Sequence, residues 1–354
     1  MSRFWSDTVR NILPYVPGEQ PQDKKYIKLN TNENPYPPSP KVIEAIRKEI
    51  GSDLRLYPDP EASLLKEALA GFYRVKPGEV FVGNGSDEIL AFCFPAFFNP
   101  GDVITFPDIT YSFYPVYAEL FGIRYETTAL NSDFTVDLGS FPEHADGILL
   151  ANPNAPTGIA VGLNEIEVLL QRNSNKLVIV DEAYVDFGAE SAVPLVKDYD
   201  NLLIVQTFSK SRALAGLRIG FAIGNRDLIE ALDRVKNSFN SYTLDRVAIR
   251  AATEAVNDKE YFAEITGRII KTREETAKRL VSLGFNVLPS RTNFLFVSHD
   301  RLSGMELYSM LKNDGILVRH FNRKGIENYL RITIGTEEEM EALVERLSCY
   351  VKSV

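Results

Sequence analysis

Six short, mostly apolar runs between residues 80 and 223 predict buried β-strands. They lie at residues 80–82, 102–106, 147–150, 176–180, 201–205 and 219–223. The runs do not alternate polar and apolar positions, which is typical of strands that are covered on both faces. Helical stretches separate several of them, for example residues 163–171. The pattern therefore predicts an α/β domain built on a mainly parallel sheet.

The pattern changes after Asn240. Residues 243–283 form a long helical stretch rich in Ala, Glu, Lys and Arg, with an expected break at Asn257–Asp258 and a stop at Gly284. Shorter elements follow, with strands expected at 293–297, 316–319 and 329–334 and helices at 305–312 and 337–350. This mixture predicts a second, smaller α+β domain.

These patterns divide the chain into three parts. Residues 1–45 contain a Pro-rich, extended segment at 34–40 and form an N-terminal arm. Residues 46–245 form the large α/β domain, and residues 246–354 form the small α+β domain. We expect the arm to pack on the small domain and on the ligand site.

Composition narrows the classes of function. The 354 residues are 45% hydrophobic and 25% charged, as in an ordinary globular protein. The net charge of −9 disfavours a nucleic-acid surface, and it requires any phosphate site to gather local positive charge. Two distant cysteines and three dispersed histidines predict neither a disulfide framework nor a metal site.

No segment predicts export or membrane insertion. The most apolar stretch, residues 89–98, is broken by Pro95 and is far shorter than the ~20 residues of a membrane span. The first residues have no uninterrupted apolar core like that of a signal peptide. We therefore expect a cytoplasmic protein without membrane or nucleic-acid partners.

Polar or conformationally special residues follow five of the predicted strands at their carboxyl ends, where open α/β sheets bind ligands. In segment 82–88, two glycines precede Ser86 and Asp87, and the free N–H groups of a helix start could bind a phosphate there. An aromatic residue in 110–114 could stack on a planar ring, and the rigid segment 151–158 could hold an amide against a ligand. Taken singly, each segment also fits an ordinary turn or a core aromatic.

Asp181 and Lys210 carry the most specific chemistry. Asp181 ends an apolar strand, so its carboxylate needs a positive partner or a structural hydrogen bond. Lys210 precedes Arg212 and Arg218, and a partly desolvated lysine beside other cations becomes a usable amine nucleophile. The alternative is a solvated turn that opens a helix. Together with a phosphate pocket and a stacking ring, a lysine amine and an acidic partner are what pyridoxal phosphate requires.

In this order, the motifs resemble those of the fold-type I pyridoxal-phosphate aminotransferases, and among them the histidinol-phosphate aminotransferases. The resemblance runs nearly end to end and is carried by LPYVPGE, KLNTNENPYPP, YPDP, GNGSDE, TYSFY, NPNAPTG, DEAYVDF, TFSKSRALAGLRIG and LRITIGT. It implies a large domain with a mainly parallel mixed sheet that binds pyridoxal phosphate, and a smaller α+β domain.

The resemblance also implies a role for each matching residue. Lys210 would form the internal aldimine and move the proton between Cα and C4′, while Asp181 would keep the ring nitrogen protonated. Tyr184 would hydrogen-bond the phenolic oxygen, and Tyr111 would stack on the ring. The remaining contacts would be made to the phosphate by Gly85, Ser86, Asp87, Ser209 and Arg218, and to the substrate by Tyr15, Asn32, Arg319 and Arg331.

Two positions need separate mention. Tyr57, in YPDP, resembles the tyrosine that reaches the cofactor phosphate of the other subunit, which implies a homodimer with shared active sites. The family usually has asparagine where this chain has Ala155. Asn154 is expected to take over the contact with the phenolic oxygen, with Asn152 or Tyr184 alone as the alternatives. Arg212 receives no role.

The resemblance implies ping-pong transamination between histidinol phosphate and 2-oxoglutarate, yielding glutamate, in histidine biosynthesis. An arginine suits both substrates, since its fork matches phosphate and carboxylate alike. An aromatic-amino-acid aminotransferase and a threonine-phosphate decarboxylase stay open as alternatives, because they would use the same cofactor residues. A ligand-binding regulatory domain of the same fold is the non-enzymatic alternative.

Overall fold

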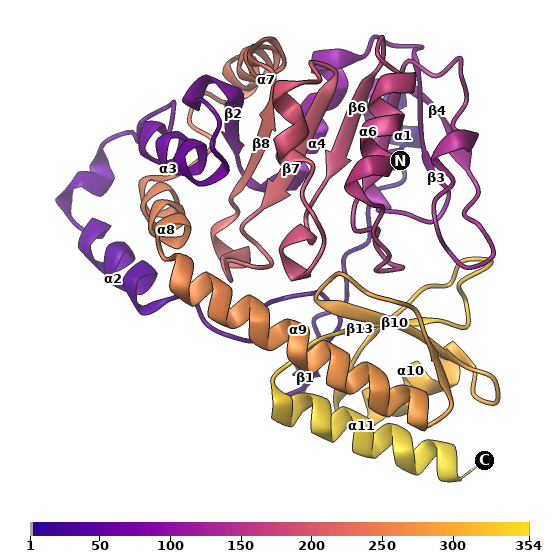
Figure 1. The fold of residues 1–354 in the computed structure, drawn as a ribbon. Helices are drawn as coiled ribbons and strands as arrows, with labels where there is room; N and C mark the ends of the chain where they lie inside the picture. The colour runs from indigo at the N-terminus through magenta and orange to yellow at the C-terminus, as the bar shows by residue number, and fades with distance from the viewer. Residues whose placement is uncertain (1–2, 354) are drawn as a thin grey trace.

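A seven-stranded sheet forms the centre of the large domain (Figure 1). The structure is a computed structural model that describes residues 3–353. Strands β3 to β7 pair in parallel, and β8 is antiparallel to both of its neighbours. The order β2-β8-β7-β6-β5-β3-β4 confirms the predicted mainly parallel mixed sheet. The bounds are β2 Val80–Gly83, β3 Val103–Pro107, β4 Arg124–Thr128, β5 Gly147–Ala151, β6 Leu177–Asp181, β7 Leu202–Thr207 and β8 Gly220–Gly224.

Helices cover both faces of this sheet, as the lack of polar alternation predicted. On β6, Val178 and Val180 enter the hydrophobic cluster on one face, whereas Ile179 enters the cluster on the other. The first cluster includes α3 (Ser63–Tyr73), α6 (Leu163–Arg172) and α8 (Arg246–Asn257). The second includes α4 (Gly85–Phe97), α5 (Phe113–Phe121) and α7 (Arg226–Phe239). The central strands of the sheet are thus closed to water on both faces, whereas the edge strand β4 is mostly exposed.

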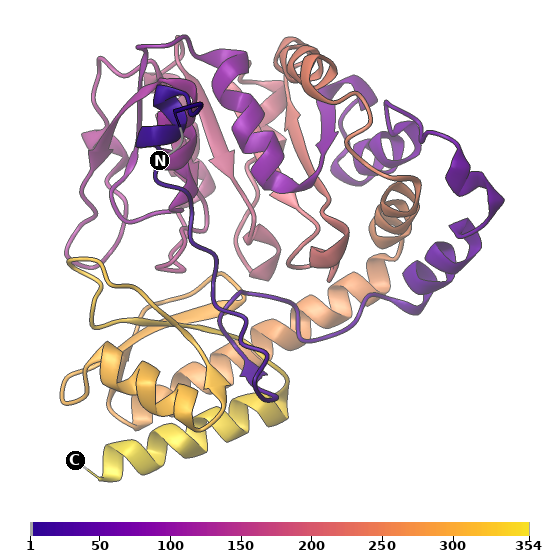
Figure 2. The same cartoon turned by 180° about the vertical axis from the view of Figure 1, so that it is seen from behind.

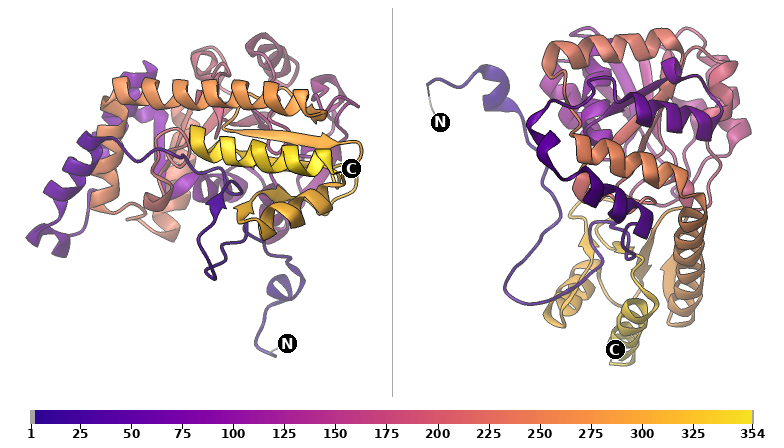
Figure 3. Two further views of the ribbon diagram at one scale, coloured as in Figure 1. Left: turned by 90° about the horizontal axis from the view of Figure 1, so that it is seen from below. Right: turned by 90° about the vertical axis from the view of Figure 1, so that its left-hand side faces the viewer.

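The small domain lies below the large sheet in Figure 1. Its antiparallel sheet has the order β12-β13-β10-β9. Helices α9 and α11 lie side by side along this domain (Figure 3). The bounds are β9 Phe285–Val287, β10 Phe294–His299, β12 Arg319–His320, β13 Leu330–Thr333, α9 Lys259–Ser282, α10 Gly304–Asn313 and α11 Glu337–Lys352.

The arm joins this domain through a strand of its own. β1 (Ile27–Lys28) pairs in parallel with β11 (Ile316–Leu317). The predicted strand 316–319 is therefore split, since β12 belongs to a different sheet. Figure 2 shows the arm descending from the level of the large sheet to the small domain. It also contains α1 (Asp7–Asn11), and α2 (Pro40–Glu49) spans its predicted end at residue 45.

Helix α8 corrects the predicted domain boundary. The break at Asn257–Asp258 is confirmed, because α8 ends and α9 begins there. However, Ala248, Ala251 and Ala252 of α8 are buried in the core of the large domain, although a boundary at residue 246 assigns them to the small one. Their small side chains let α8 pack closely against α2 and α3, so packing places the boundary near Asp258.

Short 3₁₀ helices complete the connections. They are η1 Ser52–Arg55, η2 Pro77–Glu79, η3 Leu138–Ser140, η4 Val185–Phe187, η5 Val193–Lys197 and η6 Ala215–Leu217. Within residues 3–353, no helix combines the length and the apolar character needed to cross a lipid bilayer.

Gly220 provides a test of how tightly β8 packs on the start of α4. A Cβ at this position would lie 2.4 Å from the backbone nitrogen of Ser86. We expect Gly220→Ala to lower the free energy of unfolding by about 1–3 kcal/mol, the usual cost of overpacking. Urea denaturation measures it. The control is Gly267→Ala, where a Cβ meets nothing within 4 Å and helix propensity favours alanine. Equal stability of the two variants would contradict this packing.

Candidate active site

A cavity of about 440 Å³ lies between the carboxyl edge of the large sheet, the small domain and the arm. The structure brings together there residues that are far apart in the sequence. The residues predicted from the sequence that line it are Tyr15, Asn32, Ser86, Asp87, Tyr111, Asp181, Tyr184, Ser209, Lys210, Arg218, Arg319 and Arg331. Gly85, Asn154 and Tyr57 were also predicted, and they do not line it.

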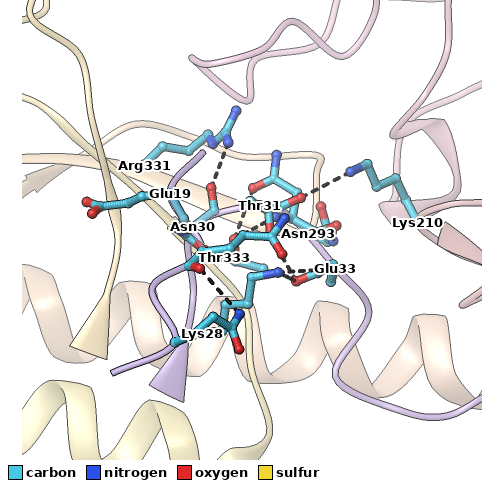
Figure 4. A network of polar contacts seen from close by, with 12 residues as sticks. Glu19, Lys28, Asn30, Thr31, Glu33, Lys210, Asn293, Arg331 and Thr333 are labelled. Carbon is cyan, nitrogen blue, oxygen red and sulfur yellow. Dashed lines mark hydrogen bonds and ion pairs between the residues drawn. The ribbon is translucent and has the colours of Figure 1, made fainter. Parts of the chain in front are cut away.

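Lys210 lies in the loop that follows β7. Its Nζ atom donates to the carbonyl oxygen of Thr31 in the arm at 3.2 Å and lies 5.8 Å from the ring centroid of Tyr184. The carbonyl oxygen of Lys210 accepts a hydrogen bond from Asn34 at 2.9 Å. Figure 4 shows the lysine reaching the arm from the side of the large domain. The arm thus fixes both the side-chain amine and the backbone carbonyl of Lys210 at the cavity.

Asp181 is the last residue of β6 and is buried. Its Oδ2 atom accepts from the Tyr114 hydroxyl at 3.0 Å, and its Oδ1 atom accepts from the backbone N–H of Ala183 at 3.2 Å. Burial raises the pKa of Asp181 to about 6, and the two hydrogen bonds oppose this rise only partly. A buried carboxylate of this kind is stabilised by any cation that enters the cavity.

Tyr184 lies three residues beyond the end of β6, immediately before η4. Its hydroxyl accepts a hydrogen bond from the side-chain amide of Asn32 at 2.9 Å. Asn32 is itself fixed in a left-handed conformation (φ 56°), with Thr333 bonded to its backbone and to its side chain. Because the hydroxyl oxygen of Tyr184 is used as an acceptor, its proton can be donated to an oxygen in the cavity.

The end of the cavity at α4 is built for an anion. Asn84 gives α4 no side-chain cap, so the positive end of the helix faces the site. Arg218, whose backbone is left-handed (φ 54°), lies beside this helix start and forms an ion pair with Asp87 at 3.1 Å. The Tyr111 hydroxyl donates to the same carboxylate at 2.8 Å. A Cβ at Gly85 would lie 2.7 Å from Nη2 of Arg218, so only glycine allows this approach.

Gly85 therefore shapes the site without lining it. Ser209 lies beside this end of the cavity and is buried. Its hydroxyl oxygen accepts from Thr207 at 3.0 Å, which leaves its own proton available to an anion.

The opposite end carries two arginines on neighbouring strands. Arg319 and Arg331 are directly paired in the register of β12 and β13, a placement that is unfavourable for like charges. Arg331 donates to the carbonyl oxygen of Asn30 at 3.1 Å, and Figure 4 shows it reaching the arm from the side opposite Lys210. Its Nε atom is buried without a hydrogen-bond partner among residues 3–353. Burial and the neighbouring Arg319 lower the pKa of Arg331. An anion bound at this point would offset the repulsion between the two guanidinium groups and could accept a hydrogen bond from Nε of Arg331.

The structure contradicts the expectation for Asn154. Its amide nitrogen donates to Ile109 at 2.9 Å and to Thr157 at 3.2 Å, and its oxygen accepts from Thr110 at 2.8 Å. All of its side-chain polar atoms are used inside the protein, and its neighbours Pro153 and Ala155 line the cavity in its place.

Asn152 is no substitute, because its side chain bonds both backbone polar groups of Val161. Neither amide is therefore free to contact a ligand in the cavity, and the expectation for the phenolic oxygen rests on Tyr184. Tyr57 is 78% exposed and stacks on Tyr242 at 4.5 Å, away from the cavity of its own chain.

Sequence reasoning missed two contributors. Tyr114 holds Asp181, and it lies within the aromatic segment 110–114 from which only Tyr111 was chosen. Tyr114 lies in the first turn of α5 (Phe113–Phe121), whereas Tyr111 precedes that helix, so helical spacing from Tyr111 gave no signal for it. Thr31 acts through its backbone carbonyl, so its side chain gave no signal.

The comparisons with known proteins agree with this architecture. The family described as "Aminotransferase class I and II" matches residues 24–347. Histidinol-phosphate aminotransferase from Clostridium beijerinckii is 55% identical over 98% of this chain and 97% of its own length. The enzyme of the same name from Clostridium acetobutylicum is 54% identical over 98% of this chain and 99% of its own length.

A solved structure is similar over the whole fold. Histidinol-phosphate aminotransferase from Sinorhizobium meliloti, in complex with pyridoxal-5′-phosphate, superposes with a TM-score of 0.90 and 26% identity. The similarity covers 100% of this chain and 99% of that chain.

The groups around the cavity fit pyridoxal phosphate. They include a lysine amine, a buried carboxylate and a helix start with a nearby arginine, where added Cβ atoms at Gly85 or Gly220 would clash. These are the groups that the cofactor's aldehyde, ring nitrogen and phosphate require. With a family match over nearly its full length, the chain belongs to the class I and II aminotransferases and is an aminotransferase that uses pyridoxal phosphate.

Proposed function

We propose that the chain is the histidinol-phosphate:2-oxoglutarate aminotransferase of histidine biosynthesis. The observation that carries this proposal is the sequence identity of 54–55% between this chain and the two clostridial enzymes of that name, over almost their entire length. The matched region spans 98% of this chain, so it includes the segments that form both ends of the cavity. The small-molecule substrates would be histidinol phosphate and the glutamate/2-oxoglutarate pair.

The paired arginines support an anionic substrate. Histidinol phosphate carries a phosphate far from its amine, and glutamate carries a carboxylate at a similar distance. Arg331, assisted by Arg319, would bind either anion through its planar fork. Tyr15, which lines the cavity and stacks on Phe113 at 4.2 Å, would cover the substrate together with Asn32.

When bound, pyridoxal phosphate supplies an electron-withdrawing ring that accepts the electron pair released as the Cα–H bond breaks. Asp181 would hold the positive ring N–H, and its own charge would be stabilised by that contact. Tyr184 would donate its proton to the phenolic oxygen, because Asn32 occupies its lone pair. Gly85, Ser86 and Asp87 would offer backbone N–H groups to the phosphate, with Ser209 and Arg218 adding side-chain contacts.

Lys210 would be both the covalent anchor and the base. Once the substrate amine displaces it, its free Nζ would take the proton from the substrate Cα and return it at C4′. Tyr111, tilted at 46° to Phe113, would lie against the ring. Release of the keto product before the keto acid binds requires ping-pong kinetics.

A homodimer with shared sites is also part of the proposal. Tyr57 is remote from the cavity of its own chain, and it is exposed together with the nearby Leu54 and Leu56 and with Tyr242, on which it stacks. Patches of this kind mark protein–protein contacts. We expect Tyr57 to reach the cofactor phosphate of the other subunit. Sedimentation of the holoenzyme as a monomer would contradict this. A cytoplasmic location is part of the same proposal, since a biosynthetic aminotransferase acts on small, soluble metabolites.

Substrate choice tests the proposal directly. We expect kcat/KM of the holoenzyme with histidinol phosphate to exceed that with phenylalanine by about a hundredfold or more, since phenylalanine leaves the arginine pair without its phosphate. Threonine phosphate should release no CO2. The Lys210→Ala variant is the control and should lose at least about a thousandfold in kcat. A preference for phenylalanine, or CO2 release, would replace this proposal by one of its alternatives.

Asp181 predicts a dependence of stability on pH. Its pKa in the folded protein, about 6, lies above the ordinary value of 3.8, so the folded state binds the proton more tightly. This stabilising contribution is complete below about pH 4 and is lost as the pH rises through about 6.

We therefore expect Asp181→Asn to raise the free energy of unfolding of the cofactor-free protein by about 1–3 kcal/mol at neutral pH. The gain should be much smaller at acidic pH. Urea denaturation at about pH 4.5 and about pH 7.5 measures the difference, and added pyridoxal phosphate should favour the wild type instead. Equal gains at both pH values would show that Asp181 is not the titrating group.

A further inference from the structure

Arg212 is a buried cation two residues beyond Lys210, and it has no part in the chemistry described above. It is only 8% exposed. It does not line the cavity, so it cannot bind the cofactor or the substrate directly. Burial lowers the pKa of Arg212, while Asp186 and Tyr73 oppose this effect. A guanidinium stays charged in a protein, so the fold must compensate its burial by specific contacts.

Those contacts come from three helices. Nη1 of Arg212 donates to the carbonyl oxygen of Ala255, near the end of α8, at 2.6 Å. Its guanidinium carbon lies 3.6 Å from the ring centroid of Phe262 on α9 and 4.9 Å from that of Phe72 on α3. The carbonyl end of α8 is the negative end of its dipole, and aromatic faces attract a cation. The cation is therefore enclosed by groups that favour its charge.

These contacts meet where the two domains are joined. Helix α8 packs in the core of the large domain, and α9 starts immediately after it and continues into the small domain (Figure 1). Phe262 lies in the first turn of α9. Arg212 thus holds the end of one helix and the beginning of the next at the junction between the domains.

The loop that carries Lys210 needs such support. Ala213 has a left-handed backbone (φ 56°), which is unfavourable for any residue with a Cβ and persists only where the surroundings impose it. The Ser211 hydroxyl donates to Asp186 at 2.5 Å, and Asn34 donates to the carbonyl oxygen of Lys210 at 2.9 Å. Each of three successive residues is thus fixed to a different part of the protein. Lys210 is bonded by Asn34 of the arm, Ser211 bonds Asp186 of η4, and Arg212 contacts α3, α8 and α9.

We propose that Arg212 is a positioning residue for the proton transfer: it fixes the Lys210 loop to the α8–α9 junction and so sets where Nζ lies relative to the substrate held by the small domain. The proposal rests on Lys210 being the reactive lysine of the proposed function. It predicts that disturbing Arg212 affects the step in which Lys210 moves a proton more than the binding of the substrate anion, because Arg331 and Arg319 do not contact Arg212.

The test is Arg212→Met in the holoenzyme, a change that keeps the side-chain length and removes the charge and the donor. We expect kcat to fall about tenfold to a hundredfold, the loss caused by misplacing a reacting group by about an ångström. KM for histidinol phosphate should change less than about threefold, since the contacts of Arg331 and Arg319 with the substrate anion are not altered. The visible circular dichroism of the bound cofactor should lose intensity, because its lysine is no longer held in one place.

Two further variants keep the test decisive. Phe262→Leu removes the ring beneath the guanidinium and leaves Arg212 in place. We expect it to lower kcat and the circular dichroism in the same direction but by less than Arg212→Met. It also provides the test if Arg212→Met does not fold. Leu343→Ala creates a cavity in the small-domain core, far from the loop, and controls for lost stability. We expect Leu343→Ala to lower the melting temperature without changing kcat or the circular dichroism at a temperature where it is folded.

Wild-type kcat and circular dichroism in both Arg212→Met and Phe262→Leu would overturn the proposal. An equal loss of kcat in Leu343→Ala would also overturn it, because the effect would then follow from stability alone. The failure of the proposed function looks different. It would appear as transamination by Lys210→Ala, whereas a failure confined to Arg212 leaves Lys210→Ala inactive.

Discussion

The central strands of the large sheet are buried on both faces, and this constraint decides where chemistry can occur. Strand residues such as Val178, Ile179 and Val180 are needed to fill the two cores, so charged side chains are excluded from the middle of these strands. They are tolerated at the carboxyl edge, where Asp181 ends β6 and Lys210 follows β7. The reactive groups are close together because neighbouring parallel strands end at the same edge.

The second requirement is positive charge in an acidic protein. With a net charge of −9, the chain gains no general attraction for anions, so it gathers local charge at both ends of one cavity. One end uses the start of α4 and Arg218, and the other uses Arg319 and Arg331. The arm lies between them and bonds both Lys210 and Arg331, which ties the large domain to the small one across the site (Figure 4).

Much of this could be predicted from the sequence. Uninterrupted apolar runs identified six strands of the large sheet because burial on both faces leaves a strong signal. β4 was missed, since it is an edge strand whose residues are mostly exposed and polar. The boundary at residue 246 was wrong because alanine-rich α8 has the composition of the helix that follows it, and only packing distinguishes their domains.

At the site, side chains at strand ends were predictable and orientations were not. Asn154 stands beside the family position at Ala155, yet its amide is consumed by Ile109, Thr157 and Thr110. Local spacing does not reveal such competition between partners. The carbonyl oxygen of Thr31 that accepts from Lys210 could not be predicted either, because every residue has a backbone carbonyl group.

Every proposed step depends on Lys210 as the residue that carries the cofactor. Reduction of the purified holoenzyme with borohydride, followed by proteolysis and mass spectrometry, identifies the lysine that is attached. We expect the phosphopyridoxyl group on the peptide that contains Lys210 and on no other lysine. Attachment to a different lysine, or a holoenzyme whose cofactor is not fixed by reduction, would contradict it.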